Sequence, residues 1–398
     1  MPSATFRTLD VVIVGAGLSG LSAAIALRRE GHRVRIFDKR DVASEVGNSI
    51  SMAKNGGQWV AYWGVDIQKG LPINLQELCM RDYKTGAVDM LYDLSDYENK
   101  WGHPYWMLHR QDMHKMLLDA ALSEEGRGTP CTLQTGYGCQ DIDFDTNAVT
   151  FSNGEVTHAD LIVGADGVVS QTRKIMDLEP EITPATSTCY RCNVYKSQLK
   201  DLNLERMADP AIQYWGGFET PDINKYNKIV MSPCNGGNII SFYCFFPAEQ
   251  AKTFKEGFNV DDIPLEDLLA PYSELDPDCF KMLQVSVDRK PWRLYKHAPL
   301  AGWTKGAVAL LGDAAHGMFP HQSQGACQGI EDAAALGIIF SSKYSYTQNI
   351  TEGLKMYERI RKPRADRVAY CSQLATEDIR ERIGFSSLVG ASLWLRCS

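Results

Sequence analysis

The sequence VVIVGAGLSG at residues 11–20 decides the fold of this chain. Its first four residues form a continuous apolar run, which is typical of a strand buried in a parallel sheet. The alanine- and leucine-rich segment 18–30 reads as a helix, and segment 32–37 reads as a second strand. Together they make a βαβ unit of about 30 residues, the context in which a G-x-G-x-x-G pattern predicts dinucleotide binding.

Each glycine of the pattern has a separate physical task. Gly15 permits a tight turn, Gly17 lets a pyrophosphate approach the backbone, and Gly20 lets the helix pack closely on the strand. The phosphates then lie at the positive N-terminus of the helix. Asp38 ends the second strand, where a carboxylate can accept hydrogen bonds from a ribose. The cofactor contacts predicted from this unit are Gly15, Gly17, Leu18, Ser19, Gly20 and Asp38.

The remaining pattern predicts an α/β fold in three parts. Residues 1–180 and 301–398 form a Rossmann-like cofactor domain, with strands at 159–164 and 307–311 and C-terminal helices at 324–340 and 351–383. The second of these helices is expected to kink or break near Pro363. Residues 181–300 alternate short aromatic stretches with proline and glycine turns, which predicts an inserted, mostly antiparallel substrate sheet. Segments 51–65 and 104–122 both read as helical.

Composition excludes several classes of partner. The 398 residues carry a net charge of −8 without a long basic run, which argues against nucleic acid and anionic membranes. No apolar run approaches the roughly 20 residues of a membrane anchor. Eleven scattered cysteines and an N-terminus without a secretory leader favour reduced thiols in the cytoplasm, and no metal site is expected. A monomer or a homodimer would suit such a chain.

A second glycine-bearing stretch, 312–326, complements the first one. Asp313 follows the strand at 307–311, so it projects from the carboxyl edge of the sheet, where ligands bind in open α/β folds. Gly325 and Ala326 begin the next helix, and their small side chains leave backbone amides open. Such amides would stabilise the negative charge on the pyrimidine side of a reduced flavin. The alternative is an ordinary loop in which Asp313 only caps a helix.

At these residues the chain resembles the single-component, FAD-dependent aromatic monooxygenases, in particular the salicylate hydroxylase-like group (group A flavoprotein monooxygenases). The resemblance covers nearly the whole chain. It rests on four motifs in the right order: the glycine pattern with Asp38, the stretch 109–114, Gly164-Ala165-Asp166-Gly167 with Ser170 and Arg173, and the stretch 312–332.

The resemblance implies a role for each matching residue. Asp38 would bind the adenosine ribose, and Arg110 would lie over the flavin or its phosphates. Asp166 would serve FAD and a transient nicotinamide, and Asp313 would contact the ribityl and pyrophosphate portion. Gly325 and Ala326 would face the isoalloxazine ring. The alternative for Arg110 is a surface salt bridge.

Two departures from the family pattern affect the cofactor site. Lys39 replaces the arginine that usually follows the second strand, and a lysine cannot reproduce a guanidinium fork. The family's Gly-Ala-Gly-Ile loop near the flavin is Gly47-Asn48-Ser49-Ile50 here. We still expect Lys39, Gly47, Asn48 and Ser49 to lie at the cofactor, and the two larger polar side chains bear on flavin movement or on substrate polarity.

The resemblance also implies a reaction. NADPH or NADH would reduce FAD, dioxygen would add to give a flavin 4a-hydroperoxide, and its terminal oxygen would pass to an electron-rich small aromatic substrate. A phenol reacts better as phenolate, although its ordinary pKa is about 10. The site therefore needs a base or a cation.

Three residues are the candidates for this task. His321 follows Pro320 and titrates in the useful range, Arg191 could hold a phenolate or carboxylate bidentately, and Tyr214 could hydrogen-bond the substrate. The alternatives are a supporting role for His321, a solvated position for Arg191 and, as the favoured interpretation, a core position for Tyr214.

Other functions stay open at this point. An aryl acid could lose its carboxyl group during hydroxylation. A flavin-dependent halogenase shares the cofactor domain, but the chain contains no Trp-x-Trp-x-Ile-Pro stretch. A non-catalytic protein of the same fold would lack FAD, and the pattern at 313–326 argues against it.

Overall fold

The structure, a computed structural model, describes residues 6–41, 47–216, 227–251 and 262–377. Its centre is a six-stranded sheet, whose strands are, in spatial order, β18 (Thr304–Lys305), β19 (Val308–Leu310), β12 (Leu161–Gly164), β1 (Asp10–Val14), β2 (Arg33–Asp38) and β8 (Thr132–Thr135). All of these strands except β18 run parallel, so their carboxyl ends share one edge. The apolar run at 11–14 forms the buried middle strand, as predicted.

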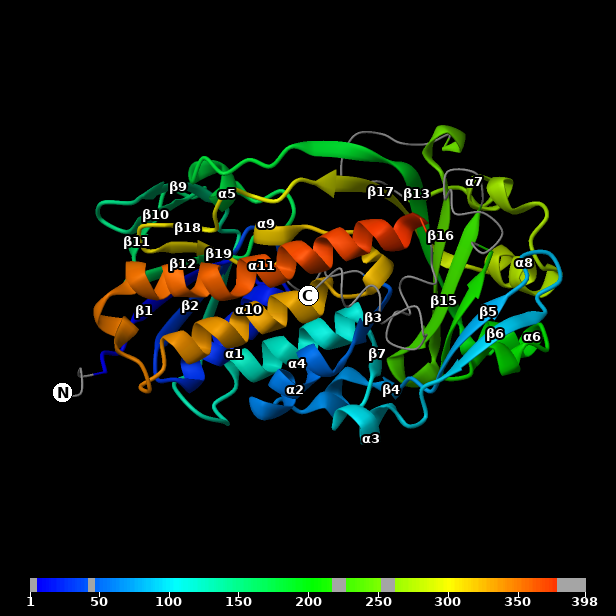
Figure 1. The fold of residues 1–398 in the computed structure, drawn as a ribbon, viewed down its shortest axis with the longest axis horizontal. Helices are drawn as coiled ribbons and strands as arrows, with labels where there is room; N and C mark the ends of the chain where they lie inside the picture. The colour runs from blue at the N-terminus through cyan, green and yellow to red at the C-terminus, as the bar shows by residue number, and fades with distance from the viewer. Residues whose placement is uncertain (1–5, 42–46, 217–226, 252–261, 378–398) are drawn as a thin grey trace.

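Helices cover one face of this sheet (Figure 1). They are α1 (Leu18–Arg29), α4 (Arg110–Leu122) and α10 (Gly325–Ile339), with α2 (Lys54–Tyr62) and α11 (Ile350–Glu377) packed against α10. A small antiparallel sheet lies on the other side, formed by β9 (Cys139–Asp143), β10 (Ala148–Phe151) and β11 (Val156–His158). Short helices α5 (Gln171–Ile175) and α9 (Asp313–His316) follow strands β12 and β19.

A seven-stranded sheet forms the second part of the molecule. Its strands are, in spatial order, β17 (Val287–His297), β13 (Ile182–Tyr195), β16 (Ile239–Pro247), β15 (Lys228–Cys234), β14 (Ala211–Trp215), β5 (Glu77–Arg81) and β6 (Val88–Asp93). Only β14 and β5 pair in parallel among these described strands, which confirms the mostly antiparallel prediction. The outer face packs on α6 (Lys196–Asp201), α7 (Leu265–Leu269) and α8 (Pro277–Gln284) around a core of its own.

Two strands of this sheet come from an unexpected place in the chain. β5 and β6 belong to the segment 1–180 that the sequence assigned to the cofactor domain, yet they extend the seven-stranded sheet beyond β14. Both strands therefore precede β13 along the chain, although they lie at the far edge of the same sheet. The division of the chain at 180 and 300 stays a prediction.

Local predictions were wrong at two points. The segment predicted as a helix at 51–65 begins as strand β3 (Ser49–Met52), and only α2 within it is helical. β3 pairs with β7 (Trp106–His109), which also pairs with β4 (Ile73–Asn74), so backbone pairing outweighs the local helical pattern. Helix α4 likewise starts only after β7, and α3 (Tyr97–Trp101) precedes it.

The helix is not broken at Pro363, because α11 continues through that residue, and the alternative of a kink there stays a prediction. The end of this predicted helix, 378–383, lies outside the described residues. Within the described ranges, no helix combines the length and the apolar character needed to cross a bilayer.

Candidate active site

A cavity of about 400 Å³ lies between the carboxyl edge of the six-stranded sheet and the inner face of the seven-stranded sheet. Both sheets and the loops between them contribute to its lining. The residues predicted from the sequence that line it are Gly15, Gly17, Leu18, Ser19, Asp38, Lys39, Asn48, Ser49, Arg110, Asp166, Arg191, Tyr214, Asp313, His321, Gly325 and Ala326. Gly20 and Gly47 are buried in the layer behind this lining.

The glycine loop has the geometry that a dinucleotide phosphate requires. Gly15 has φ +109°, and a Cβ there would lie 2.4 Å from the carbonyl oxygen of Ala165. A Cβ at Gly20 would lie 2.0 Å from the carbonyl oxygen of Gly15. At Gly17 a Cβ would meet no atom within 4 Å, so this glycine faces open space in the cavity. The first and third glycines thus serve close packing, and the second leaves room for a ligand.

Asp38 is fixed at the end of β2 by backbone donors. The amide of Ala16 donates to Oδ2 at 2.7 Å, and the amide of Arg40 donates to Oδ1 at 2.8 Å. Each oxygen keeps a further lone pair for a ribose hydroxyl. His114 holds the same loop from behind, because its Nε2–H donates to the carbonyl of Ala16 at 2.7 Å. Burial lowers the pKa of His114, which favours the neutral ring.

Two helix N-termini point positive ends at the cavity. Helix α1 begins after Gly17 and α10 begins after Gln324, and neither cap residue makes a side-chain capping bond. Neither helix has an acid in its first turn. A Cβ at Gly325 would lie 3.9 Å from Oδ1 of Asp313, which brings the two halves of the second glycine stretch together. Glycine cradle, ribose acceptor and open amides fit FAD at this site.

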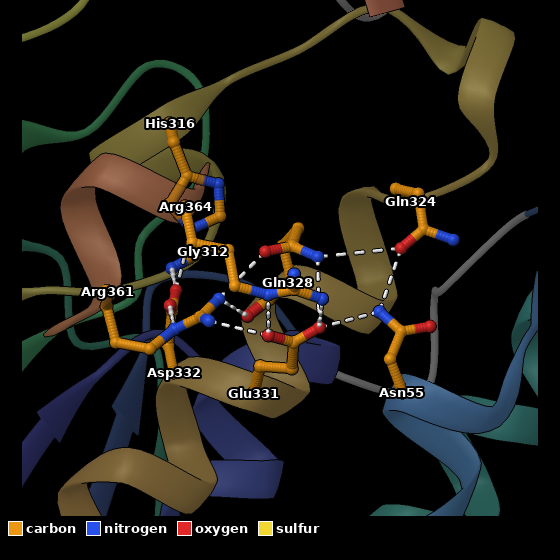
Figure 2. Close-up of polar contacts among 9 residues, drawn as sticks. All are labelled: Asn55, Gly312, His316, Gln324, Gln328, Glu331, Asp332, Arg361 and Arg364. Atoms are coloured by element: carbon orange, nitrogen blue, oxygen red, sulfur yellow. Dashed lines mark hydrogen bonds and ion pairs between the residues drawn. The ribbon is translucent and has the colours of Figure 1, made fainter. Parts of the chain in front are cut away.

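A buried polar network holds the second glycine stretch in place (Figure 2). Asp332 on α10 accepts hydrogen bonds from the amide of Gly312 at 3.1 Å and from Nε2 of His316 at 2.6 Å. Arg361 on α11 donates from Nε to the other oxygen of Asp332 at 2.7 Å. Arg361 also donates from Nη1 to Glu331 at 2.6 Å. His316 is therefore a structural residue of the Asp313 turn.

The charges of this network are coupled. Burial acts to lower the pKa of His316, but the charge and hydrogen bond of Asp332 outweigh it, so the pKa is raised. Burial acts to raise the pKa of Asp332, but His316 and Arg361 outweigh it, so the pKa is lowered. Both shifts favour a charged pair beneath the Gly312–Asp313 turn.

The Asn48–Ser49 loop is hydrogen-bonded to the inserted sheet. Nδ2 of Asn48 donates to the carbonyl of Cys192 at 2.9 Å and to Oδ1 of Asn193 at 3.1 Å. The amide of Ser49 donates to Oγ of Ser241 at 2.9 Å. The side chain of Asn48 and the backbone amide of Ser49, two residues that depart from the family pattern, thus tie the loop to the seven-stranded sheet. Gly47 lies at the base of the loop, where a Cβ would be 2.5 Å from Cβ of Arg110.

Arg110 and Asp166 both line the cavity. Arg110 is half-buried, and its pKa is lowered because burial outweighs the opposing effect of the Asp313 charge. Asp166 accepts hydrogen bonds from the hydroxyl of Ser170 and from the amide of Thr172, so its carboxylate is fixed at the start of α5. The surface position that was the alternative for Arg110 does not occur, because Arg110 lines the cavity.

Arg191 and Tyr214 lie on the opposite wall, which the seven-stranded sheet forms, whereas His321 lies in the short helical turn before α10. Arg191 on β13 stacks over the ring of Trp292, with its Cζ 4.7 Å from the ring centroid. Tyr214 on β14 is fully buried and lines the cavity, so it combines a core position with a site position. His321 is buried, and the centroid of its ring lies 5.1 Å from that of the Phe245 ring. Whether these three residues act on a substrate stays a prediction.

Sequence reasoning missed several residues of this wall. Lys228 and Val230 on β15, Tyr243 and Phe245 on β16 and Trp292 on β17 all line the cavity. β15 and most of β16 are buried on both faces, so the pattern carries no alternation that separates the cavity face from the core face. A lysine directly before the apolar run 229–231 was the available signal for Lys228.

Comparisons with known proteins agree with this site. The model of the family described as FAD binding domain matches residues 8–372. Hispidin-3-hydroxylase of Neonothopanus nambi is 32% identical over 377 residues, which cover 91% of this chain and 87% of that protein. An FAD-dependent monooxygenase of Aspergillus candidus is 30% identical over 397 residues, which cover 94% and 88% of the two chains.

The fold is also found among solved structures. A salicylate hydroxylase in complex with its substrate superposes with a TM-score of 0.74 at 20% sequence identity, over 97% of this chain and 95% of that chain. At this identity the likeness shows the fold.

Proposed function

The chain belongs to the FAD binding domain family and is an FAD-dependent monooxygenase, and we propose that it uses NADH or NADPH to hydroxylate an electron-rich aromatic or phenolic small molecule. One observation carries the proposal. The predicted cofactor residues and an aromatic, cationic sheet wall line the same cavity. The names of the relatives agree with it, since hispidin-3-hydroxylase is named as a hydroxylase.

The chain's own residues would bind and orient the cofactor. The chemistry that bound FAD supplies is acceptance of a hydride from the nicotinamide and activation of dioxygen. The glycine loop and the start of α1 would hold the diphosphate, and Asp38 would hold the adenosine ribose. Gly325 and Ala326 would present the first amides of α10 to the pyrimidine side of the ring. Asp313 and Arg110 would flank the linker between these two ends.

The opposite wall would bind and activate the substrate. Arg191 would hold an anionic oxygen, and its half-buried position over Trp292 restricts the directions in which it can donate. His321 would take the proton of a phenol, whose pKa the cation Arg191 would lower toward that of an imidazole. Tyr214 would hydrogen-bond the ring oxygen from β14. Exclusion of water by the aromatic side chains strengthens each of these contacts.

A reducing compartment such as the cytoplasm fits the chemistry of the thiols. Cysteines from both cores are buried without disulfides in the described part of the chain, and burial raises the pKa of several of them, for example Cys131 to about 12. Such thiols are inert.

The test begins with the colour of the purified protein. We expect flavin absorption, and oxidation of NADH or NADPH that accelerates when the right member of a panel of phenols and aryl acids is added. A colourless protein that FAD cannot reconstitute would refute the proposal. Product analysis separates hydroxylation from decarboxylative hydroxylation, because only the latter releases carbon dioxide.

Residue roles need matched variants. Arg191→Ala should abolish the substrate-stimulated part of nicotinamide oxidation. Arg293→Ala is the control, because Arg293 stacks over Tyr295 at 5.5 Å on the neighbouring strand and is not among the cavity-lining residues. His321→Ala should slow product formation while FAD content is unchanged. Equal activities of Arg191→Ala and Arg293→Ala would remove Arg191 from the site.

A further inference from the structure

Lys228 is a buried cation in the cavity wall opposite the predicted cofactor residues. It is the first residue of β15, its relative exposure is 2%, and it lines the cavity. Its Nζ lies 4.9 Å from the centroid of the Phe245 ring. Removing an ammonium group from water is costly, so a lysine in this position calls for a physical reason.

The register of the sheet places Lys228 and Arg191 on one face. Lys228 pairs with Phe245, and Arg191 pairs with Tyr243 two positions earlier on the intervening strand β16. Side chains two residues apart on a strand point to the same side. The two cations therefore flank β16, one from β13 and one from β15, with the rings of Tyr243 and Phe245 between them.

The acids of the cavity lie on one of its two walls only. Its acids are Asp38, Asp166 and Asp313, and all of them belong to the cofactor part of the chain. The cavity-lining residues that come from the seven-stranded sheet, as far as the structure describes them, include Arg191 and Lys228 but no aspartate or glutamate. This wall thus presents positive charge and aromatic surface to whatever binds against it.

Both cations are set against aromatic rings. Arg191 stacks on Trp292 and Lys228 on Phe245, and His321 lies beside the same Phe245 ring. Such cation–π contacts hold the charged groups themselves over the faces of the rings and so keep them in the cavity wall. A flat ring with a negatively charged oxygen matches this surface in both shape and charge.

We propose that Lys228 is a second anion anchor of the substrate site, and that the enzyme selects aromatic substrates that carry an anionic oxygen, held between Lys228 and Arg191. The inference rests on the proposed function. A lysine offers three donors as a point charge, so it accepts a carboxylate or a ring oxyanion equally well. A ring oxygen next to the ammonium group would stay ionised, which makes the ring more electron-rich.

The test compares binding of anionic and neutral probes to the FAD-loaded protein. Benzoate and benzamide differ in charge at nearly equal shape, and their dissociation constants can be read from the change in flavin absorption. We expect the wild type to prefer benzoate. Lys228→Met should weaken benzoate binding about 10- to 100-fold, the effect of losing one charge-assisted hydrogen bond, and leave benzamide binding unchanged.

Two further variants separate charge from packing. Lys228→Arg keeps the charge and should keep the preference for benzoate, while Lys228→Gln replaces Met if the latter does not fold. Lys305→Met is the matched control, because Lys305 also lies over a phenylalanine ring, at 4.2 Å from that of Phe144, but is exposed outside the cavity. If Lys228→Arg loses the preference as fully as Lys228→Met, the charge does not bind the anion and the inference is overturned.

A second probe identifies the type of anion. 4-Cyanophenol is titrated at pH values on either side of its own pKa, and tighter binding of the ionised form that disappears in Lys228→Met assigns the anchor to a ring oxyanion. An effect on benzoate alone assigns it to a carboxylate. Equal constants for wild type and Lys228→Met with both probes refute the inference. The proposed function fails separately, if the wild type neither retains FAD nor oxidises a nicotinamide.

Discussion

Replacing Arg361 by methionine should destabilise the protein through the network beneath the flavin site. Arg361 is 4% exposed and is the only side chain of α11 that is drawn bonding to both acids of α10 in Figure 2. It donates to Asp332 at 2.7 Å and to Glu331 at 2.6 Å, and its Nη2 donates to Oε1 of Gln328 at 2.8 Å. Methionine keeps most of the apolar stem but removes all of these donors.

The expected loss of stability depends on which hydrogen-bond partners Asp332 and Glu331 keep in the variant. Removing one partner of a buried ion pair costs about 3–5 kcal/mol. Asp332 retains His316 and the amide of Gly312, and Glu331 retains Arg364 at 2.6 Å, so the lower end, about 3 kcal/mol, applies. The entropy of unfolding is about 2.1 cal/mol/K per residue, which for 398 residues converts this loss into a fall in Tm of about 4 °C.

Arg364 provides the control, because it pairs with the same Glu331 from a side chain that is 52% exposed. Arg364→Met should cost at most about 1 kcal/mol and lower Tm by about 1 °C. The assay is thermal unfolding of both variants with FAD present, followed by circular dichroism at one scan rate. Equal shifts for the two variants, or a shift below about 1 °C for Arg361→Met, would refute the reasoning that burial decides the loss.

Three further predictions concern the loop, the charged pair and the sheet contact. Gly15→Ala should lower both Tm and FAD content, because its Cβ would meet the carbonyl of Ala165 at 2.4 Å. Gly17→Ala should lower FAD content alone, because a Cβ there meets nothing within 4 Å. The reverse order would contradict the roles given to these glycines. The pKa of His316 is raised above its ordinary 6.5, and the pKa of Asp332 is lowered below its ordinary 3.8. The ion pair therefore contributes its full stabilisation between about pH 4 and 6.5. This contribution is lost when the pH rises through the folded-state pKa of His316 or falls through that of Asp332. The Tm difference between wild type and His316→Gln should therefore be largest inside that window and shrink above it; a difference that grows toward pH 9 would show the wrong sign. Asn48→Ala removes the donor shared by Cys192 and Asn193, and it should lower the free energy of unfolding in urea by about 1 kcal/mol. The control Asn99→Ala, at an exposed residue, should lower it by less than about 0.5 kcal/mol. Equal values would mean that these hydrogen bonds do not hold the loop.

The cofactor side could be predicted from the sequence because its signals are local. The strand at 11–14, the three glycines and Asp38 lie within one βαβ unit, and their spacing alone brings them to one edge of the sheet. Asp313 and Gly325 follow a strand of the same sheet, so their meeting with the first loop required only the rule that parallel strands share a carboxyl edge.

The substrate side could be predicted only in part, because its geometry depends on pairing between distant strands. Lys228 comes next to Phe245 and Arg191 next to Tyr243 only through the register of β13, β15 and β16. Periodicity cannot supply that register where both faces of a strand are buried. β5 and β6 join the sheet for the same reason, through a parallel pairing with β14 across more than a hundred residues.

The Asn48–Ser49 loop links these two sides and explains why its polar side chains are tolerated. Larger side chains in place of small ones bring polar groups into a buried region, and burial without hydrogen bonds would cost about 1–3 kcal/mol for each group. The sheet provides the partners of these side chains: Asn193 accepts from Nδ2 of Asn48, and the hydroxyl of Ser232 shares a hydrogen bond with that of Ser49. The hydroxyl of Tyr243 also donates to the backbone carbonyl of Ser49 at 2.5 Å. Tyr243 stands between Arg191 and Lys228 on the cavity wall. The loop and this wall therefore form one hydrogen-bonded unit, so a substitution on either side changes the shape of the cavity that both of them line.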